Sequence, residues 1–129
     1  MNPLTVEWIE KASADLATAG REIRARKDPN YDAVCFHAQQ CVEKLLKAAL
    51  TECGRDFSRT HDLNHLLDLI LAVNPLWDVF RPGFQELVAY AVEYRYPGEN
   101  SDKEMARTAL NTAKAFSAEF FNQYGGGGR

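Results

Sequence analysis

Four polar side chains recur at spacings of three, four and three residues in the second helical pattern of the chain. They are His37, Gln40, Lys44 and Lys47. Residues three and four apart share one side of an α-helix, so these side chains form a polar stripe. Imidazole, amide and ammonium groups donate hydrogen bonds and supply positive charge, which suits a phosphate or another anion. The spacing therefore makes the stripe a candidate anion-binding site.

A second group of candidates follows the fourth helical pattern, at Tyr94, Arg95 and Tyr96. An arginine guanidinium presents a planar fork of donors that matches a phosphate. Aromatic rings beside it are suited to stacking on a nucleobase. If this segment meets the stripe, Arg95 clamps the phosphate, the tyrosines stack on the base, and Gln39 or Gln40 reads base edges or holds the arginine.

The same residues also fit a purely structural role. Glu43 precedes Lys47 by four residues and is placed to pair with it, which contributes about a few tenths of a kcal/mol on a solvated helix face. His37 then becomes a bundle histidine with one satisfied nitrogen. An arginine at a helix end often bonds the last carbonyl groups, and tyrosines often pack the rim of a bundle. By the same reasoning, the basic run from Arg21 to Lys27 is predicted to be a solvated helix end rather than an RNA patch.

The histidines raise two further kinds of chemistry. His61 and His65 are four residues apart, a spacing that suits a transition metal, but the neighbouring leucines point into the core. We therefore predict no metal site, and no cofactor. Sequence templates for dinucleotide and nucleotide phosphate loops, serine hydrolases and zinc proteases are absent. One catalytic alternative stays open, a ribonuclease that uses His37 or His61 together with Arg95.

The elements that must position these residues are all helical, because apolar residues recur at three- and four-residue spacings between Pro and Gly interruptions. The predicted helices run from about Thr5 to Lys27, Tyr31 to Cys53, His61 or Asp62 to Asn74, and Arg81 to Tyr94, with a short turn at 75–80 and a last helix that begins at the capping box Ser101–Glu104. Long helices with short connections pack as antiparallel neighbours. The sequence predicts an all-α, up-and-down four-helix bundle with an additional short helix, in one domain at 1–124, followed by a flexible Gly-rich tail at 125–129.

The length, charge and composition of the chain exclude several classes of protein. A chain of 129 residues with a net charge of −3 fits one domain and argues against a protein that coats DNA. It shows neither a secretory signal nor an apolar run of about 20 residues, and its three cysteines form no CxxC pair. We therefore expect a cytoplasmic protein with reduced thiols and no membrane partner. Its large side chains exceed what a thin bundle buries, which favours self-association: Trp8, Trp77, Phe80, Phe84, Phe116, Phe120, Phe121 and Tyr124.

Three local signatures occur in order along the chain. They are Phe36–Ala48 on the second helix, Thr60-His61-Asp62-Leu63 with Leu66-Leu67 on the third, and Tyr94-Arg95-Tyr96-Pro97-Gly98 after the fourth. Together they resemble the HEPN family, small helical domains often found beside minimal nucleotidyltransferases, over almost the whole chain. The resemblance implies a bundle that usually dimerises and associates with nucleotides or RNA, often as one half of a toxin–antitoxin pair with a nucleotidyltransferase partner.

The ribonuclease members of that family carry an arginine followed four to six residues later by a histidine, beside the dimer axis. Arg95 occupies the position of the arginine, but residues 96–102 contain no histidine. Arg55 and His61 have the right spacing, yet they lie in a loop, so we interpret that match as chance. Cleavage needs a general base and a proton donor, and arginine serves poorly as either. The sequence therefore predicts a HEPN-like nucleotide- or RNA-binding module without catalysis, with a homodimer as its expected state.

Overall fold

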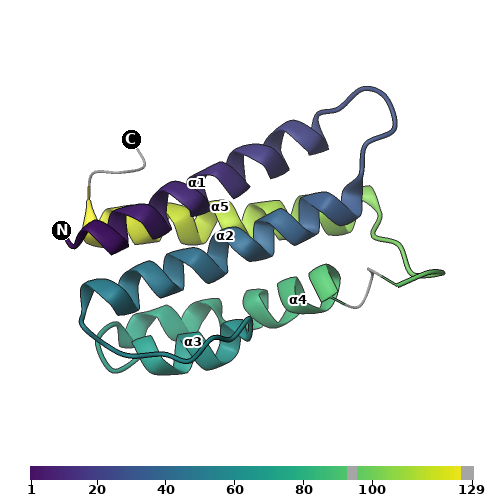
Figure 1. Cartoon of the computed structure of the whole chain (residues 1–129). Coiled ribbons are helices and arrows are strands. Elements are labelled where there is room, and N and C mark those ends of the chain that lie inside the picture. Colours follow the sequence, from purple (N-terminus) through teal and green to yellow (C-terminus); the bar gives the residue numbers. More distant parts are fainter. Residues whose placement is uncertain (93–95, 126–129) are drawn as a thin grey trace.

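The computed structural model describes residues 1–92 and 96–125, and every regular element in these ranges is a helix. In chain order the elements are α1 (Pro3–Ile23), α2 (Tyr31–Glu52), α3 (Leu63–Ile70), the 3-10 helix η1 (Pro75–Phe80), α4 (Arg81–Val92) and α5 (Lys103–Tyr124). Figure 1 shows α1, α2, α4 and α5 running in alternating directions, with α3 on the connection between α2 and α4. The predicted all-α bundle with an additional short helix is confirmed.

The first helix begins and ends earlier than the sequence suggested. The Asn2 side chain accepts a hydrogen bond from the backbone N–H of Leu4 at 2.8 Å, so α1 starts beside its proline rather than at Thr5. The helix ends at Ile23 instead of Lys27, and the basic residues that follow belong to the connection to α2. Its last turn and the connection to α2 therefore project at one end of the molecule (Figure 1).

The last helix begins one residue later than the predicted capping box. Asp102 is the N-cap, and its carboxylate accepts from the backbone N–H of Met105 at 2.8 Å. The backbone N–H of Ser101 instead donates to the Asp32 carboxylate at 2.7 Å, which ties this start to α2. Of the predicted flexible tail, residues 126–129 lie outside the described residues.

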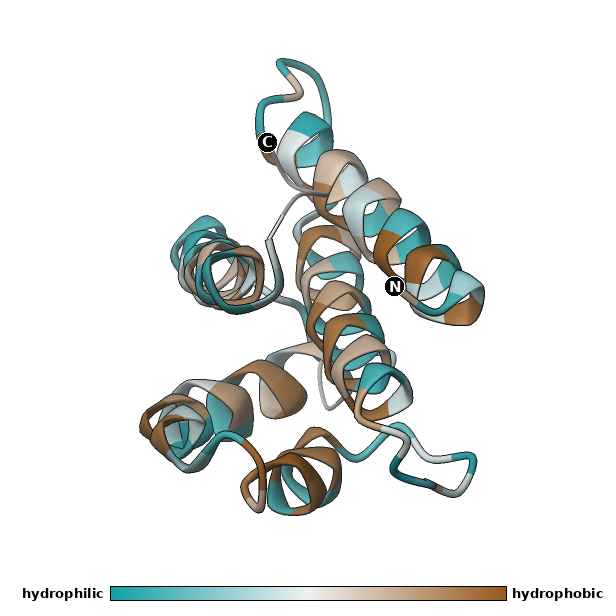
Figure 2. Ribbon diagram, turned by 90° about the vertical axis from the view of Figure 1, so that its left-hand side faces the viewer, coloured by the Kyte–Doolittle hydropathy of each residue, from teal (hydrophilic) through white to brown (hydrophobic). Residues whose placement is uncertain are grey.

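The second helix is the centre of the molecule, since it contacts α1, α3, α4 and α5. Its buried residues include the apolar face predicted from the sequence, together with the polar side chains of Gln39, Glu43 and Lys47. Figure 2 shows hydrophobic residues on the sides of the helices that face one another. In the described ranges, no helix combines the length and apolar character needed to span a bilayer.

Four of the eight large side chains noted in the sequence are buried inside the bundle: Trp77, Phe84, Phe116 and Phe120. The Phe116 ring is the hub of one cluster, with centroids 4.9 Å from Trp77, 5.1 Å from Phe80 and 5.2 Å from Phe84. The exposed apolar side chains are different residues, chiefly Leu76 at 86% and Val79 at 76% exposure on η1. The other four large side chains are only partly buried, so the self-association inferred from this set stays a prediction, and an exposed apolar segment exists in addition.

Candidate functional site

The polar stripe predicted on α2 is divided between two carboxylates. The first is Asp15 of α1, which contacts the His37 ring nitrogen Nδ1 at 2.8 Å and the Lys44 ammonium at 2.5 Å. One oxygen serves each partner, so the carboxylate bridges two residues that are seven apart on α2. All three side chains keep partial access to solvent, at 12% for Asp15, 30% for His37 and 21% for Lys44.

The second carboxylate is Glu43 on α2 itself. It contacts the Lys47 ammonium at 3.0 Å, the His61 Nδ1 at 3.1 Å, and the side-chain amide of Gln39 at 3.2 Å. Gln40 completes this network by donating to the Gln39 side-chain oxygen at 2.9 Å. The i,i+4 pairing of Glu43 with Lys47 that the sequence suggested is thus present, but in a buried setting rather than on a solvated face.

The ammonium group of Lys47 is enclosed on two sides. Its side chain is 8% exposed, Glu43 lies on one side, and the Trp8 ring centroid from α1 lies 5.5 Å away in a cation–π arrangement. Charges in such surroundings need their partners, and removing one partner of a buried pair typically costs about 3–5 kcal/mol. Lys47 therefore stabilises the α1–α2 contact, whereas Lys44 retains access to solvent.

Of the aromatic and arginine candidates after α4, the structure describes only Tyr96. Tyr96 is 65% exposed. Tyr94 and Arg95 lie outside the described residues, so their predicted meeting with the α2 stripe stays a prediction.

The two candidate catalytic histidines contact different carboxylates, since His37 is held by Asp15 and His61 by Glu43. His61 is 83% exposed at the loop before α3.

Sequence reasoning missed the two residues of α1 that organise the stripe, Trp8 and Asp15. A signal for Asp15 was available, because it stands between Ala12 and Ala19 on the apolar side of α1. A carboxylate on a helix face that packs inward needs a cationic or donor partner across the contact. The sequence pattern alone did not show that the partners would be His37 and Lys44.

The cysteines do not add a reactive group to this region. Burial raises the pKa of the Cys41 thiol to about 12, and the negative charge of Asp15 raises it further while Lys44 acts in the opposite direction. Burial also raises the pKa of the Cys35 thiol. Because the thiolate is the nucleophilic and metal-binding form, both side chains behave as inert core residues at neutral pH. Within residues 1–92 and 96–125, no group of three or more His, Cys, Asp or Glu side chains is placed to hold a metal ion.

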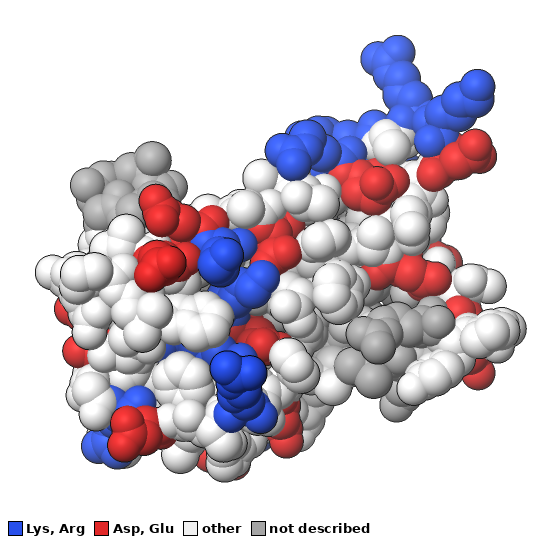
Figure 3. Space-filling model, viewed as in Figure 1, with Lys and Arg blue, Asp and Glu red and all other residues white. Residues whose placement is uncertain are grey.

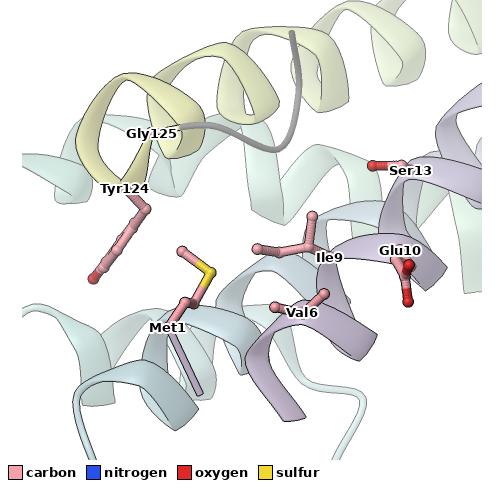
Figure 4. A pocket seen from close by; sticks show the side chains of 7 residues that line it. All are labelled: Met1, Val6, Ile9, Glu10, Ser13, Tyr124 and Gly125. Carbon is pink, nitrogen blue, oxygen red and sulfur yellow. The ribbon is translucent and has the colours of Figure 1, made fainter. Parts of the chain in front are cut away.

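A separate hollow lies between the start of α1 and the end of α5. It has a volume of about 580 Å³, and Figure 4 shows the Met1, Val6, Ile9 and Tyr124 side chains around it. Its polar lining consists of Glu10 and Ser13, together with the phenol of Tyr124. Burial raises the pKa of that phenol to about 12, so it stays protonated at neutral pH. The hollow is thus lined largely by apolar side chains, and none of the lysines and arginines that the structure describes lines it.

Comparisons with known proteins agree on one family. The family model of the HEPN domain matches residues 5–122 of this chain. The crystal structure of ST0689, an archaeal HEPN homologue, is similar at 25% sequence identity with a TM-score of 0.68. That match covers 92% of this chain and 96% of the archaeal chain. No curated protein matches significantly.

Proposed function

The chain belongs to the HEPN domain family, and we propose that it is a non-catalytic module that binds a nucleotide or the end of an RNA. The ligand's phosphate is held by His37, Gln40 and Lys44 from α2 and by Arg95 from the segment after α4. Tyr94 and Tyr96 stack on the base. Lys47 acts indirectly, because it holds the Glu43 carboxylate in place.

The observation that supports this proposal most is the bridging position of Asp15. It fixes His37 and Lys44 beside each other, while each keeps partial solvent access. Asp15 occupies Nδ1 of the imidazole, which leaves Nε2 for a ligand, and an ammonium group has three donors of which Asp15 takes one. The cluster is therefore preorganised for an anion, although the carboxylate offsets part of its charge.

The separation of the two histidines supports a binding role over catalysis. Cleavage of a phosphodiester bond needs a general base and a proton donor at one phosphate. His37 and His61 belong to different carboxylate networks, and no histidine follows Arg95 within residues 96–102. Arginine supplies a phosphate clamp but neither proton-transfer role.

Thermal unfolding in the presence of mononucleotides and short RNAs with a terminal phosphate tests the proposal. A ligand well above its dissociation constant should raise the unfolding free energy by about 2–3 kcal/mol. Arg95→Ala and Lys44→Ala should lose that gain, whereas Lys11→Ala, an exposed lysine of α1, should keep it. The proposal fails if no nucleotide stabilises the wild type, or if Arg95→Ala responds as the wild type does.

We propose further that the protein is a homodimer and partners a minimal nucleotidyltransferase in a toxin–antitoxin-type pair. The support for an interface is the exposed apolar segment at Leu76 and Val79, which a solitary bundle leaves in water. Light scattering at micromolar concentration should give twice the chain mass, and Leu76→Glu combined with Val79→Glu should give the monomer. A wild-type monomer would contradict the dimer. Failure to co-purify with a co-expressed nucleotidyltransferase would contradict the partnership.

A metal-independent ribonuclease is the alternative, and one observation favours it. A carboxylate on Nδ1 of an imidazole is the arrangement that orients a general base, and Asp15 holds His37 in this way. Incubation of labelled RNA with the protein and a chelator decides between the two functions. The binding module leaves the RNA intact. Cleavage that disappears in His37→Ala would establish the ribonuclease instead.

A further inference from the structure

A second hollow lies between the later part of α1 and the facing side of α5, and we call it the basic groove. Its volume is about 390 Å³. The side chains that characterise it come from both helices: Leu16, Gly20, Arg21 and Arg24 on α1, and Lys114, Ser117 and Phe121 on α5. A helical wheel places the glycine and the two arginines of this set on the side of α1 opposite Trp8 and Asp15. The basic groove is therefore separate from the α2 networks.

The cationic groups of the basic groove have no carboxylate partner in the part of the chain that the structure describes. Among the described residues, none of Arg21, Arg24 and Lys114 forms an ion pair, and no acidic residue lines the groove. Arg21 donates to the Thr18 hydroxyl at 3.3 Å. The nearby Glu22 carboxylate is engaged elsewhere, since it accepts from the backbone N–H of Asn30 at 2.8 Å. Positive charge thus gathers in a hollow of a chain whose net charge is −3.

The floor of the groove is shaped to admit a guanidinium. Gly20 is buried, and a methyl group on its Cα would lie 3.3 Å from Nη1 of Arg24. The missing side chain leaves room for the Nη1 end of Arg24, an exposed residue, beside this turn of α1. A glycine in the middle of a helix costs about 0.5–1 kcal/mol relative to alanine. The position therefore gives up helix stability and gains room for the arginine.

The lining indicates the class of ligand. Two guanidinium forks and an ammonium favour phosphate groups, and the Ser117 hydroxyl adds a neutral donor. The half-buried ring of Phe121 stands in the same groove and offers a face or edge to a base. Beyond the groove lie exposed Arg26 and Lys27, followed by Asp28, and Figure 3 shows Lys and Arg side chains at this end of α1 with acidic side chains among them.

We propose that the basic groove binds the phosphodiester backbone of a single-stranded nucleic acid. An elongated row of unpaired cations beside an aromatic ring suits successive phosphates with a base between them. Arg21 and Arg24 of α1 and Lys114 of α5 line the same groove, and Arg26 and Lys27 follow α1 in the sequence. This site uses no residue of the α2 stripe and does not depend on the function proposed above. The basic residues of the run are exposed, as expected of a solvated helix end, and the proposal assigns a ligand to two of them.

Fluorescence anisotropy with a labelled single strand of about 12 nucleotides, as RNA and as DNA, tests the groove. Arg21→Ala combined with Arg24→Ala should weaken binding at least about tenfold, and Lys114→Ala should weaken it less. Between about 50 and 200 mM salt, the slope of log affinity against log salt should become shallower by about 0.7 for each phosphate that the variant no longer neutralises. Lys11→Ala combined with Arg59→Ala removes the same charge from exposed positions elsewhere and should leave affinity and slope near the wild-type values.

Stabilisation by a mononucleotide separates this proposal from the function of the α2 stripe, because Arg21→Ala combined with Arg24→Ala should keep the stabilisation that Lys44→Ala loses. Equal losses in the groove variant and the charge-matched control would overturn the groove, since net charge alone would then explain binding. Competition by an acidic peptide as effective as unlabelled RNA would also overturn it, because the site would then select carboxylates. No measurable binding at the lower salt concentration would do the same.

Discussion

The cationic side chains of α2 and those of the basic groove lie on opposite sides of α1. The two groups differ in their surroundings. On the α2 side, Lys44 meets Asp15 and Lys47 meets Glu43. On the α5 side, Arg21, Arg24 and Lys114 meet no carboxylate within the described ranges. The difference follows from the placement of carboxylates, because Asp15 of α1 and Glu43 of α2 lie beside the α2 cations and no acidic residue of the described ranges lines the groove. A row of cations on one helix therefore does not reveal whether they are available to a ligand.

The largest expected effect comes from breaking the buried pair. Glu43→Ala leaves the Lys47 ammonium at 8% exposure without its carboxylate, so the unfolding free energy should fall by about 3–5 kcal/mol. Urea denaturation measures the loss. Glu7→Ala, at an exposed position on α1, is the control and should stay within about 0.5 kcal/mol of the wild type. A loss below about 1 kcal/mol for Glu43→Ala would mean that the network is not buried as described.

The next effect concerns pH on the buried side of α2. The Cys41 thiol has a pKa of about 12 in the folded chain against 9.0 ordinarily, because burial disfavours the thiolate. As pH rises through this window, the unfolded chain loses the proton first, so stability present below pH 9 is progressively lost toward pH 12. Between about pH 8 and about pH 11, this thiol should account for a loss of about 2–3 kcal/mol.

Comparing the wild type with Cys41→Ala at both pH values isolates that contribution. The variant should lose less stability between the two pH values, although Tyr124, whose pKa is also raised to about 12, still contributes to the loss in both proteins. Equal losses in the two proteins would show that the thiol is solvated.

A substitution at the floor of the basic groove is expected to raise stability slightly and to lower the affinity for nucleic acid. Gly20→Ala should raise the unfolding free energy by about 0.5–1 kcal/mol, because alanine is the better helix former. The added methyl group, 3.3 Å from Arg24, should shift the guanidinium and weaken nucleic-acid binding. Urea denaturation and anisotropy on one preparation check both signs. A variant that gains stability and binds as the wild type does would remove Gly20 from the site.

The smallest effect on stability is expected from the unpaired cations themselves. Arg21→Ala combined with Arg24→Ala should change the unfolding free energy by no more than about 0.5 kcal/mol, because neither guanidinium has an ion-pair partner among the described residues. The same double variant should lose most of the nucleic-acid affinity. A large loss of stability, measured by urea denaturation, would place these arginines among the structural residues instead.

The sequence predicted the architecture well and the site only in part. Apolar spacing and proline breaks were sufficient for the helices, because helix periodicity is a local property. The stripe on α2 was predicted for the same reason, and its residues do lie along one helix. The partners Trp8 and Asp15 were missed because they belong to another helix. The basic groove was missed because it exists only where α1 faces α5.

The most direct test compares available and engaged cations in one experiment. In nuclear magnetic resonance spectra that observe side-chain nitrogens, a short single-stranded RNA is titrated into the full chain. The Nε–H signals of Arg21 and Arg24 should shift progressively, whereas the Nζ signal of Lys47, enclosed by Glu43 and Trp8, should stay in place. A shift of the Lys47 signal with unmoved arginine signals would contradict the account.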